Sequence, residues 1–202
     1  MIINNKDRIY ISIDFETGGE IGKSCIVEFG IAVFSNYKLV DSYGGLIKPY
    51  APIEKKYLDY SGIDEKELKA CTFTLEDMIE ILIETCKEYN PKNNKYKRPA
   101  LVGHNLHAFD EVWIKDAFER CGKNYKDYFG FISFDTLELT DIIFHNSIKL
   151  KDRKLGTVCA YLGISTGIKH TAEDDAIACG NLFNKYLKYY SKTFDKATIL
   201  KL

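Results

Sequence analysis

An apolar strand that ends in two acidic residues is the feature that most constrains how this 202-residue chain can fold. Ile9, Ile11 and Ile13 alternate with other residues, which is the period-two pattern of a β-strand. Asp14 and Glu16 follow, and side chains two residues apart on a strand project from the same face. Two neighbouring carboxylates repel each other and lose hydration if they are buried. A bound divalent cation would offset both costs, whereas a solvent-exposed strand end would avoid them.

The rest of the apolar pattern predicts an α/β fold with a mixed central β-sheet flanked by helices. Apolar runs over 25–34 and 37–47 predict two more strands joined by a hairpin turn near Asn36, and residues 100–103 and 131–134 predict two further strands. Helices are expected over 74–89, 109–121, 153–162 and 172–190, with another that begins at Asp135 as its N-cap. The polar stretch 90–98 is interpreted as a surface loop. Strands first, then alternating strands and helices, is typical of one mixed sheet.

Composition narrows the class of protein. A length of 202 residues with 46% hydrophobic and 28% charged residues predicts a single globular domain over 1–202. No apolar run approaches the roughly 18 residues of a membrane span, no signal peptide is recognisable, and the six cysteines form no C-x-x-C pair. We therefore expect a cytoplasmic protein with reduced cysteines and no membrane contact. The net charge of −1 argues against a broad DNA clamp, so a nucleic-acid ligand would need metal ions to supply positive charge.

Two further segments place acidic residues where helices are expected to begin. HNLHAFD, residues 104–110, puts Asp110 at a predicted helix start, and HTAEDD, residues 170–175, puts Asp175 in the first turn of another helix, close to His170. Each arrangement has a structural alternative, since acidic residues in a first turn stabilise the helix dipole. His104 and His107 are interpreted as packing or supporting residues, because no third histidine or cysteine stands at a suitable metal-ligand spacing.

Taken together, the segments DFETG, HNLHAFD and HTAEDDA resemble, in this order, the three motifs of the DEDDh (DnaQ-like) 3′–5′ exonucleases, which have an RNase H-like fold. The resemblance extends from Tyr10 to about Leu187. The form of the second and third motifs looks more like the three-prime repair exonuclease branch than like bacterial proofreading subunits.

The resemblance implies a catalytic site with two divalent metal ions, Mg²⁺ or Mn²⁺. Asp14, Glu16, Asp110 and Asp175 match the family's four metal-binding carboxylates, and His170 matches its general base. An imidazole with an ordinary pKa near 6.5 can take a proton from water at neutral pH. Four carboxylates and two divalent ions sum to zero charge, which would let an otherwise acidic site accept a phosphate.

The same resemblance implies contacts to the terminal nucleotide. Thr17 and Gly18 are expected to touch it, with Asn105 and Phe109 on the other side of the pocket. Thr17 could equally be a hydrogen bonder at the strand end, and Phe109 could belong to the core.

The expected function is therefore 3′–5′ exonuclease activity on nucleic-acid 3′ ends, with DNA as the first choice of substrate. Three alternatives stay open at this point: an exoribonuclease of the same family, a proofreading or binding subunit that acts with a polymerase, and an inactive scaffold. Many relatives are dimers, so a homodimer is a further possibility, although no segment of the sequence indicates a two-fold interface.

Overall fold

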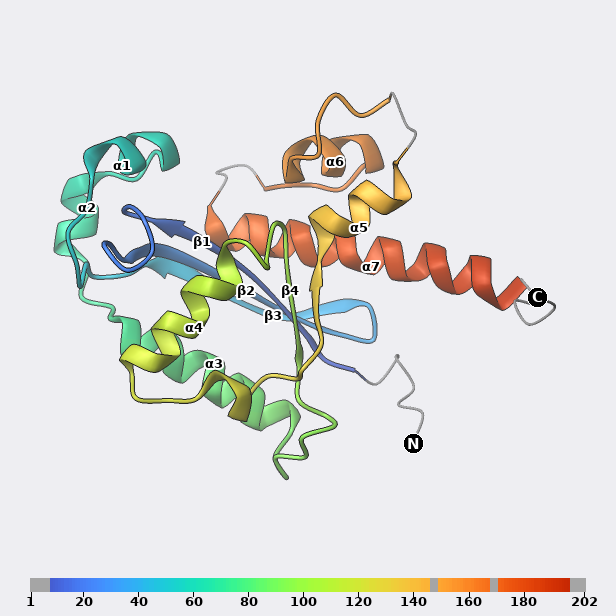
Figure 1. The fold of residues 1–202 in the computed structure, drawn as a ribbon, viewed down its shortest axis with the longest axis horizontal. Helices are drawn as coiled ribbons and strands as arrows, with labels where there is room; N and C mark the ends of the chain where they lie inside the picture. The colour runs from blue at the N-terminus through green and yellow to red at the C-terminus, as the bar shows by residue number, and fades with distance from the viewer. Residues whose placement is uncertain (1–7, 146–148, 168–170, 197–202) are drawn as a thin grey trace.

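The computed structural model describes residues 8–145, 149–167 and 171–196 and, within 191–196, the backbone only. Five strands form one sheet in the order β3-β2-β1-β4-β5 (Figure 1). Their bounds are β1 Tyr10–Thr17, β2 Ile26–Ser35, β3 Lys38–Leu46, β4 Ala100–Gly103 and β5 Ser133–Asp135. The first three strands are antiparallel, whereas β4 and β5 run parallel to β1. The predicted mixed sheet is confirmed.

The longest strands carry the sequence features that predicted them. The hairpin between β2 and β3 turns at Asn36 and Tyr37, whose φ angles of 49° and 62° are those of a tight two-residue hairpin turn. Strand β1 lies at the centre, and its residues Ile11, Ile13 and Phe15 are buried against one helical layer. β1 pairs with β4 only from Tyr10 to Ser12, so the last residues of β1 extend beyond the end of β4. The candidate acidic residues lie on this extension.

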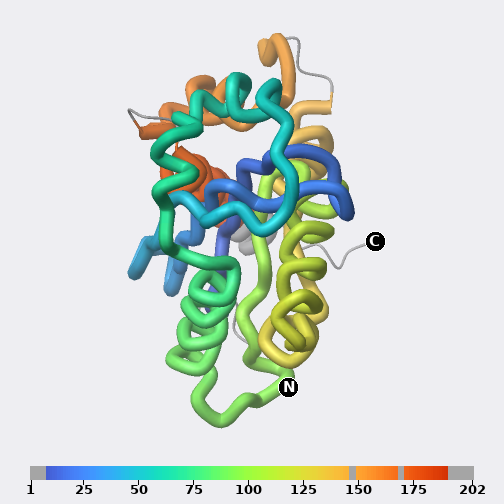
Figure 2. Tube along the Cα trace, turned by 90° about the vertical axis from the view of Figure 1, so that its left-hand side faces the viewer, coloured from blue at the N-terminus to red at the C-terminus, as the bar shows by residue number. Residues whose placement is uncertain are grey.

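Helices cover both faces of the sheet. α3 (Leu75–Tyr89) and α4 (Asp110–Arg120) lie side by side on one face (Figure 2), and α7 (Ala172–Lys196) crosses the other. α3, the helix predicted over 74–89, begins with a capping box between Thr74 and Asp77. Its apolar face is buried in the core: Leu75, Met78, Ile79, Leu82 and Ile83. α5 (Thr136–Ile143) and α6 (Leu155–Leu162) pack with α7 in a smaller cluster.

The structure adds two helices that the sequence pattern did not predict, α1 (Lys55–Ser61) and α2 (Glu65–Ala70). Each buries one leucine, Leu58 or Leu68, so neither shows a periodic apolar stripe. A short 3₁₀ turn, η2 (Tyr125–Asp127), was also missed. Strand β5 is shorter than the predicted strand over 131–134 and begins two residues further along the chain. Phe131 lies outside the sheet, with 82% of its surface exposed. Among the described helices, none combines the length and apolar character that crossing a membrane requires.

Glycines allow α7 to approach the sheet closely. A Cβ atom added at Gly30 of β2 would lie 1.9 Å from the backbone oxygen of Ala172, the first residue of α7. At Gly180, on α7 itself, an added Cβ would lie 2.0 Å from the ring of Phe34. Gly30 is also the residue paired with Asp14 across the sheet. The start of α7 is therefore held directly over the acidic end of β1.

We predict that Gly30→Ala lowers the free energy of unfolding by about 3 kcal/mol, the upper part of the range for overpacking, because a backbone atom of α7 must move. Thermal and denaturant unfolding measure the change. Gly156→Ala is the matched control, since an added Cβ there meets nothing within 4 Å and the residue lies within α6. Equal stability of the two variants would contradict the close-packing argument.

Candidate active site

The first three candidate carboxylates meet where β1 extends beyond β4. Asp14 and Glu16 project from the sheet face that α7 covers, opposite the face of Ile13 and Phe15. Asp110, the first residue of α4, is 3% exposed, and its Oδ1 accepts a hydrogen bond of 3.1 Å from the backbone N–H of Phe15. That N–H lies on the edge of β1 that β4 leaves unpaired. Asp110 is thus fixed to the strand that carries the other two acids.

Asp175 reaches the same group from α7. It lies in the first turn of the helix, and its backbone N–H donates to the carbonyl of Thr171 at 3.0 Å. Its negative charge raises the pKa of both Asp14 and Glu16, so it lies close enough to both for their electrostatic interaction to matter. The structure therefore brings all four predicted carboxylates together.

Burial and mutual repulsion favour the neutral form of these acids. Burial is the main cause that raises the pKa of Asp14 well above its usual value, followed by the charges of Asp110, Asp175, Glu16 and Glu28. Burial also raises the pKa of Glu16 to about 7, with further contributions from Glu28 and Asp175. For Asp110, burial raises the pKa to about 8 although the hydrogen bond from Phe15 opposes the shift. Among the described residues, the charged groups that act on Asp14, Glu16 and Asp110 are all negative.

The donor set fits hard divalent cations. All four groups offer carboxylate oxygens, the ligands that Mg²⁺ and Mn²⁺ prefer. The charges that act on Asp14 are those of other carboxylates, so a cation would relieve both its desolvation and its repulsion. Asp14, Glu16, Asp110 and Asp175 are accordingly the residues that could hold one or more ions.

Sequence reasoning missed a fifth acid, Glu28. It pairs with Glu16 across β1 and β2, and its Oε1 accepts a hydrogen bond of 3.4 Å from the N–H of Ala172 at the start of α7. Burial is the main cause that raises its pKa. The only signal in the sequence was an acidic residue within an apolar run, and its position beside Glu16 depends on strand register.

Asp135 does more than cap a helix. Its carboxylate accepts the predicted capping bond from Leu137 N at 2.8 Å, and also bonds from Asn105 N at 3.0 Å and His107 N at 3.3 Å. The last two lie in the loop between β4 and Asp110. Asn105 has a φ of 68°, a left-handed conformation that this carboxylate helps to hold. Asp135 is therefore a positioning residue for the second acidic segment.

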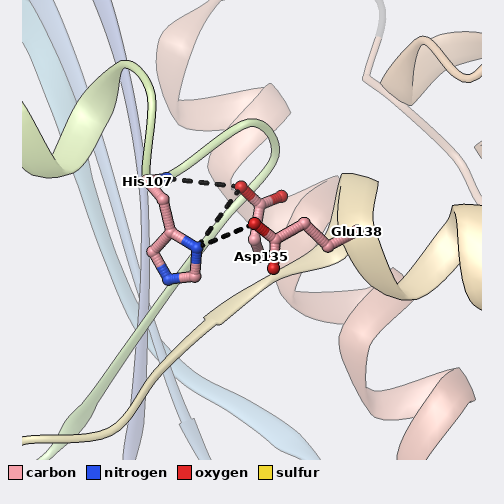
Figure 3. Close-up of side chains that lie close together, drawn as sticks. All are labelled: His107, Asp135 and Glu138. Atoms are coloured by element: carbon pink, nitrogen blue, oxygen red, sulfur yellow. Dashed lines mark hydrogen bonds and ion pairs between the residues drawn. The ribbon is translucent and has the colours of Figure 1, made fainter.

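His107, Asp135 and Glu138 form a small cluster of their own (Figure 3). His107 Nδ1 lies 3.1 Å from Glu138 Oε1 and 4.0 Å from Asp135 Oδ2, and one ligand atom of each residue lies within 4.8 Å of the others. His107 Nε2 also contacts Ser133 Oγ at 3.1 Å. His104 bridges Thr136 Oγ1 and the carbonyl of Arg153, at 2.9 and 2.8 Å. His104 thus makes the supporting contacts that the sequence predicted, whereas His107 belongs to a group whose ligand atoms could hold a metal ion.

A cavity of about 660 Å³ opens beside Glu16, and we call it the active-site cavity. Its lining includes Thr17 and Phe109, both predicted to contact substrate, together with residues from α1 and α4: Tyr57, Tyr60, Val112 and Trp113. Phe109 is 37% exposed, so the alternative of a core residue does not hold. Among the described residues, Gly18 and Asn105 do not line the cavity, and their substrate contacts stay predictions. The tyrosines of α1 were missed because α1 itself was not predicted.

The predicted general base, His170, lies outside the described residues. The structure describes its neighbour Thr171, whose Oγ1 accepts a hydrogen bond of 3.2 Å from Asp174 N at the start of α7. The role of His170 stays a prediction.

Comparison with known proteins places this geometry in a family. A family model described as "Exonuclease" (RNase_T) matches residues 11–183, most of the chain. The chain belongs to this exonuclease family. The expected enzyme class, a nuclease, is confirmed with it.

The chain matches short segments of curated relatives that are much longer proteins. The chain is 27% identical over 180 residues to the PolC-type DNA polymerase III of Caldanaerobacter subterraneus subsp. tengcongensis, covering 89% of this chain and 12% of that protein. It is 27% identical over 184 residues to the 3′-5′ exonuclease DinG of Staphylococcus aureus, covering 89% of this chain and 18% of that protein. The assignment to the three-prime repair branch stays a prediction.

Solved structures share the fold. Exonuclease I of E. coli in complex with a dT13 oligonucleotide matches with a TM-score of 0.75 at 15% identity, over 94% of this chain and 43% of that chain. The nuclease domain of 3′hExo, a DEDDh family member bound to rAMP, matches with a TM-score of 0.70 at 14% identity, over 93% and 95% of the two chains. The predicted RNase H-like fold is confirmed.

We predict that the metal-free enzyme loses stability as the pH rises. An acid whose pKa is raised in the folded state contributes its full stabilisation below its unfolded pKa, which is 3.8 for Asp110 and 4.5 for Glu16. This contribution is lost as the pH rises through the folded pKa, which is about 8 for Asp110 and about 7 for Glu16. Thermal unfolding in chelator should therefore show a falling melting temperature across this range, which Asp110→Asn makes shallower. A flat profile for the wild type would contradict the raised pKa values.

We further predict that Asp135→Ala lowers the free energy of unfolding by about 2–4 kcal/mol, because three backbone N–H groups lose a charged acceptor. Asp64→Ala is the control, since Asp64 caps α2 at an exposed position by accepting from Lys66 N and Glu67 N. Its loss should cost about 1 kcal/mol. Equal costs would show that Asp135 acts only as a helix cap.

Proposed function

We propose that this domain removes nucleotides from the 3′ ends of nucleic acid and releases nucleoside 5′-monophosphates. The observation that carries the proposal is the meeting of Asp14, Glu16, Asp110 and Asp175, from three distant segments, beside the active-site cavity. The relative DinG is named a 3′-5′ exonuclease. The chain spans less than a fifth of the length of the PolC and DinG proteins, so any activity of a longer protein that contains this domain is also a proposal.

The proposed cofactor is a pair of divalent ions, Mg²⁺ or Mn²⁺, held by the four carboxylates. Bound there, such ions would make water more acidic and would stabilise negative charge on the phosphate. The chain's own residues supply the remaining functions. His170 would accept the proton of the attacking water, while Thr17 and Phe109 hold the terminal nucleotide in the cavity beside Glu16. The hydrogen bond from Phe15 to Asp110 keeps the acids in place as ions come and go.

DNA is the substrate we propose, on the strength of the polymerase relative and the oligonucleotide in the exonuclease I complex. RNA is the second candidate, because one structure of this fold is bound to rAMP and another concerns recognition of a histone mRNA stem-loop. Association with a polymerase is a further proposal that the PolC relative supports. All six cysteines are free thiols, and we propose a cytoplasmic, reducing location on that basis.

We predict that Asp14→Asn, Asp175→Asn and His170→Ala each slow release of mononucleotides, the two carboxylate variants by about 10³-fold or more, since metal-assisted catalysis supplies several kcal/mol. Matched 5′- and 3′-labelled DNA and RNA oligonucleotides, with either end blocked and with or without chelator, test polarity, metal dependence and substrate together.

Asp174→Asn is the control for Asp175→Asn, because both acids lie in the first turn of α7 and carry the same charge. It should keep most of the activity. Wild-type enzyme that leaves unblocked DNA and RNA intact in Mg²⁺ and in Mn²⁺ would overturn the proposed function.

A further inference from the structure

A second hollow, of about 520 Å³, lies beside α4 and is not explained by the three acidic motifs. Four cationic side chains line it: Lys95, Arg98, Lys115 and Lys126. Its one acid, Glu111, is paired with Lys115 at 2.9 Å. We call this hollow the basic groove. Its charge is opposite to that of the active site, and it stands out on a chain whose net charge is −1.

Exposed aromatic rings lie among these cations. Phe131 is 82% exposed and Tyr96 is 58% exposed, and both line the groove. Lys95 Nζ lies 5.0 Å from the centre of the Tyr96 ring. A ligand that covers these rings would remove apolar surface from water, which is favourable. Aromatic rings set among lysines and arginines are the usual platform for stacking the bases of a single strand, with the cations on its phosphates.

The polar loop 90–98 presents part of this surface in a fixed conformation. Asn90 is 7% exposed, and its side chain bonds to the backbone of Asn94 twice, both at 3.0 Å. Arg98 donates to Asn93 Oδ1 at 3.3 Å and to the carbonyl of Lys126, which joins the loop to η2. These bonds hold the cations of the loop across the groove from α4.

The groove also begins next to the catalytic residues. Phe109, just before α4, and Val112 on α4 line the active-site cavity, whereas Glu111 and Lys115 on the same helix line the basic groove. Ser133 lines the groove and contacts His107, two residues before Phe109. Its other lining residues lie in η2 and in the loops before β4 and β5. The loop before β4 lies at the opposite end of that strand from the acidic group, because β4 runs parallel to β1 (Figure 1).

We propose that the basic groove binds the single strand of nucleic acid upstream of the 3′ end that lies in the active-site cavity. This rests on the proposed function and extends it, because the substrate would be a single strand several nucleotides long. Lys95 and Lys126 would contact phosphates, and neither makes a salt bridge with any residue that the structure describes. Phe131 and Tyr96 would stack bases.

Substrates of different length distinguish the contribution of the basic groove from that of the active site. Binding of a fluorescent single strand of about 16 nucleotides, the upper end of common site sizes, is measured by anisotropy in chelator so that no cleavage is needed. Phe131→Ala should weaken binding about tenfold, the loss expected for one base stack. Lys95→Ala/Lys126→Ala should lower the slope of log affinity against log salt by about 1.4, or 0.7 for each phosphate contact. Hydrolysis of a dinucleotide should stay at the wild-type rate.

Lys38→Ala/Lys66→Ala removes the same charge from exposed positions outside both hollows and should leave the slope almost unchanged. Wild-type affinity in the groove variants would overturn the proposal, as would an equal loss with the control pair or on the dinucleotide. If the groove binds an acidic protein instead, the groove variants would bind the strand with wild-type affinity. If the wild type binds the strand with groove-dependent affinity but cleaves nothing, the groove stands and the proposed function fails.

Discussion

The close contact between α7 and the sheet is the constraint on which the candidate site depends. Gly30 leaves room for the backbone of Ala172, and this brings the first turn of α7 over the strand pair that carries Asp14, Glu16 and Glu28. A side chain at that position would push the helix away and separate Asp175 from the other acids. The same packing buries the acids, so the geometry that assembles the site also makes it electrostatically costly.

That cost has a functional meaning. Five carboxylates from four segments lie together, and burial with mutual repulsion raises the pKa values of Asp14, Glu16, Glu28 and Asp110. Such an arrangement lowers stability near neutral pH unless cations bind. Hydrogen bonds from the backbone hold the group in place. Asp135 holds the loop before Asp110, and Glu28 accepts from the first N–H of α7.

Charge is distributed unevenly over the molecule. The acids gather where β1 extends beyond β4, while cations and exposed rings line the groove along α4 and loop 90–98. An overall charge of −1 therefore conceals two regions of opposite sign. Positive charge near the cleavage site attracts a polyanionic substrate. A local basic groove can supply that charge although the chain as a whole carries a net charge of −1.

The sequence by itself determined the central strands, α3 with its capping box, the exonuclease family and the four carboxylates, because periodic burial and short motifs are local properties. It could not determine α1 and α2, whose single buried leucines leave no pattern, or the shift of β5 that exposes Phe131. Glu28, the second role of Asp135 and the basic groove were decided only by tertiary structure. Each depends on residues far apart in the chain meeting through strand register or helix packing, which no local pattern records.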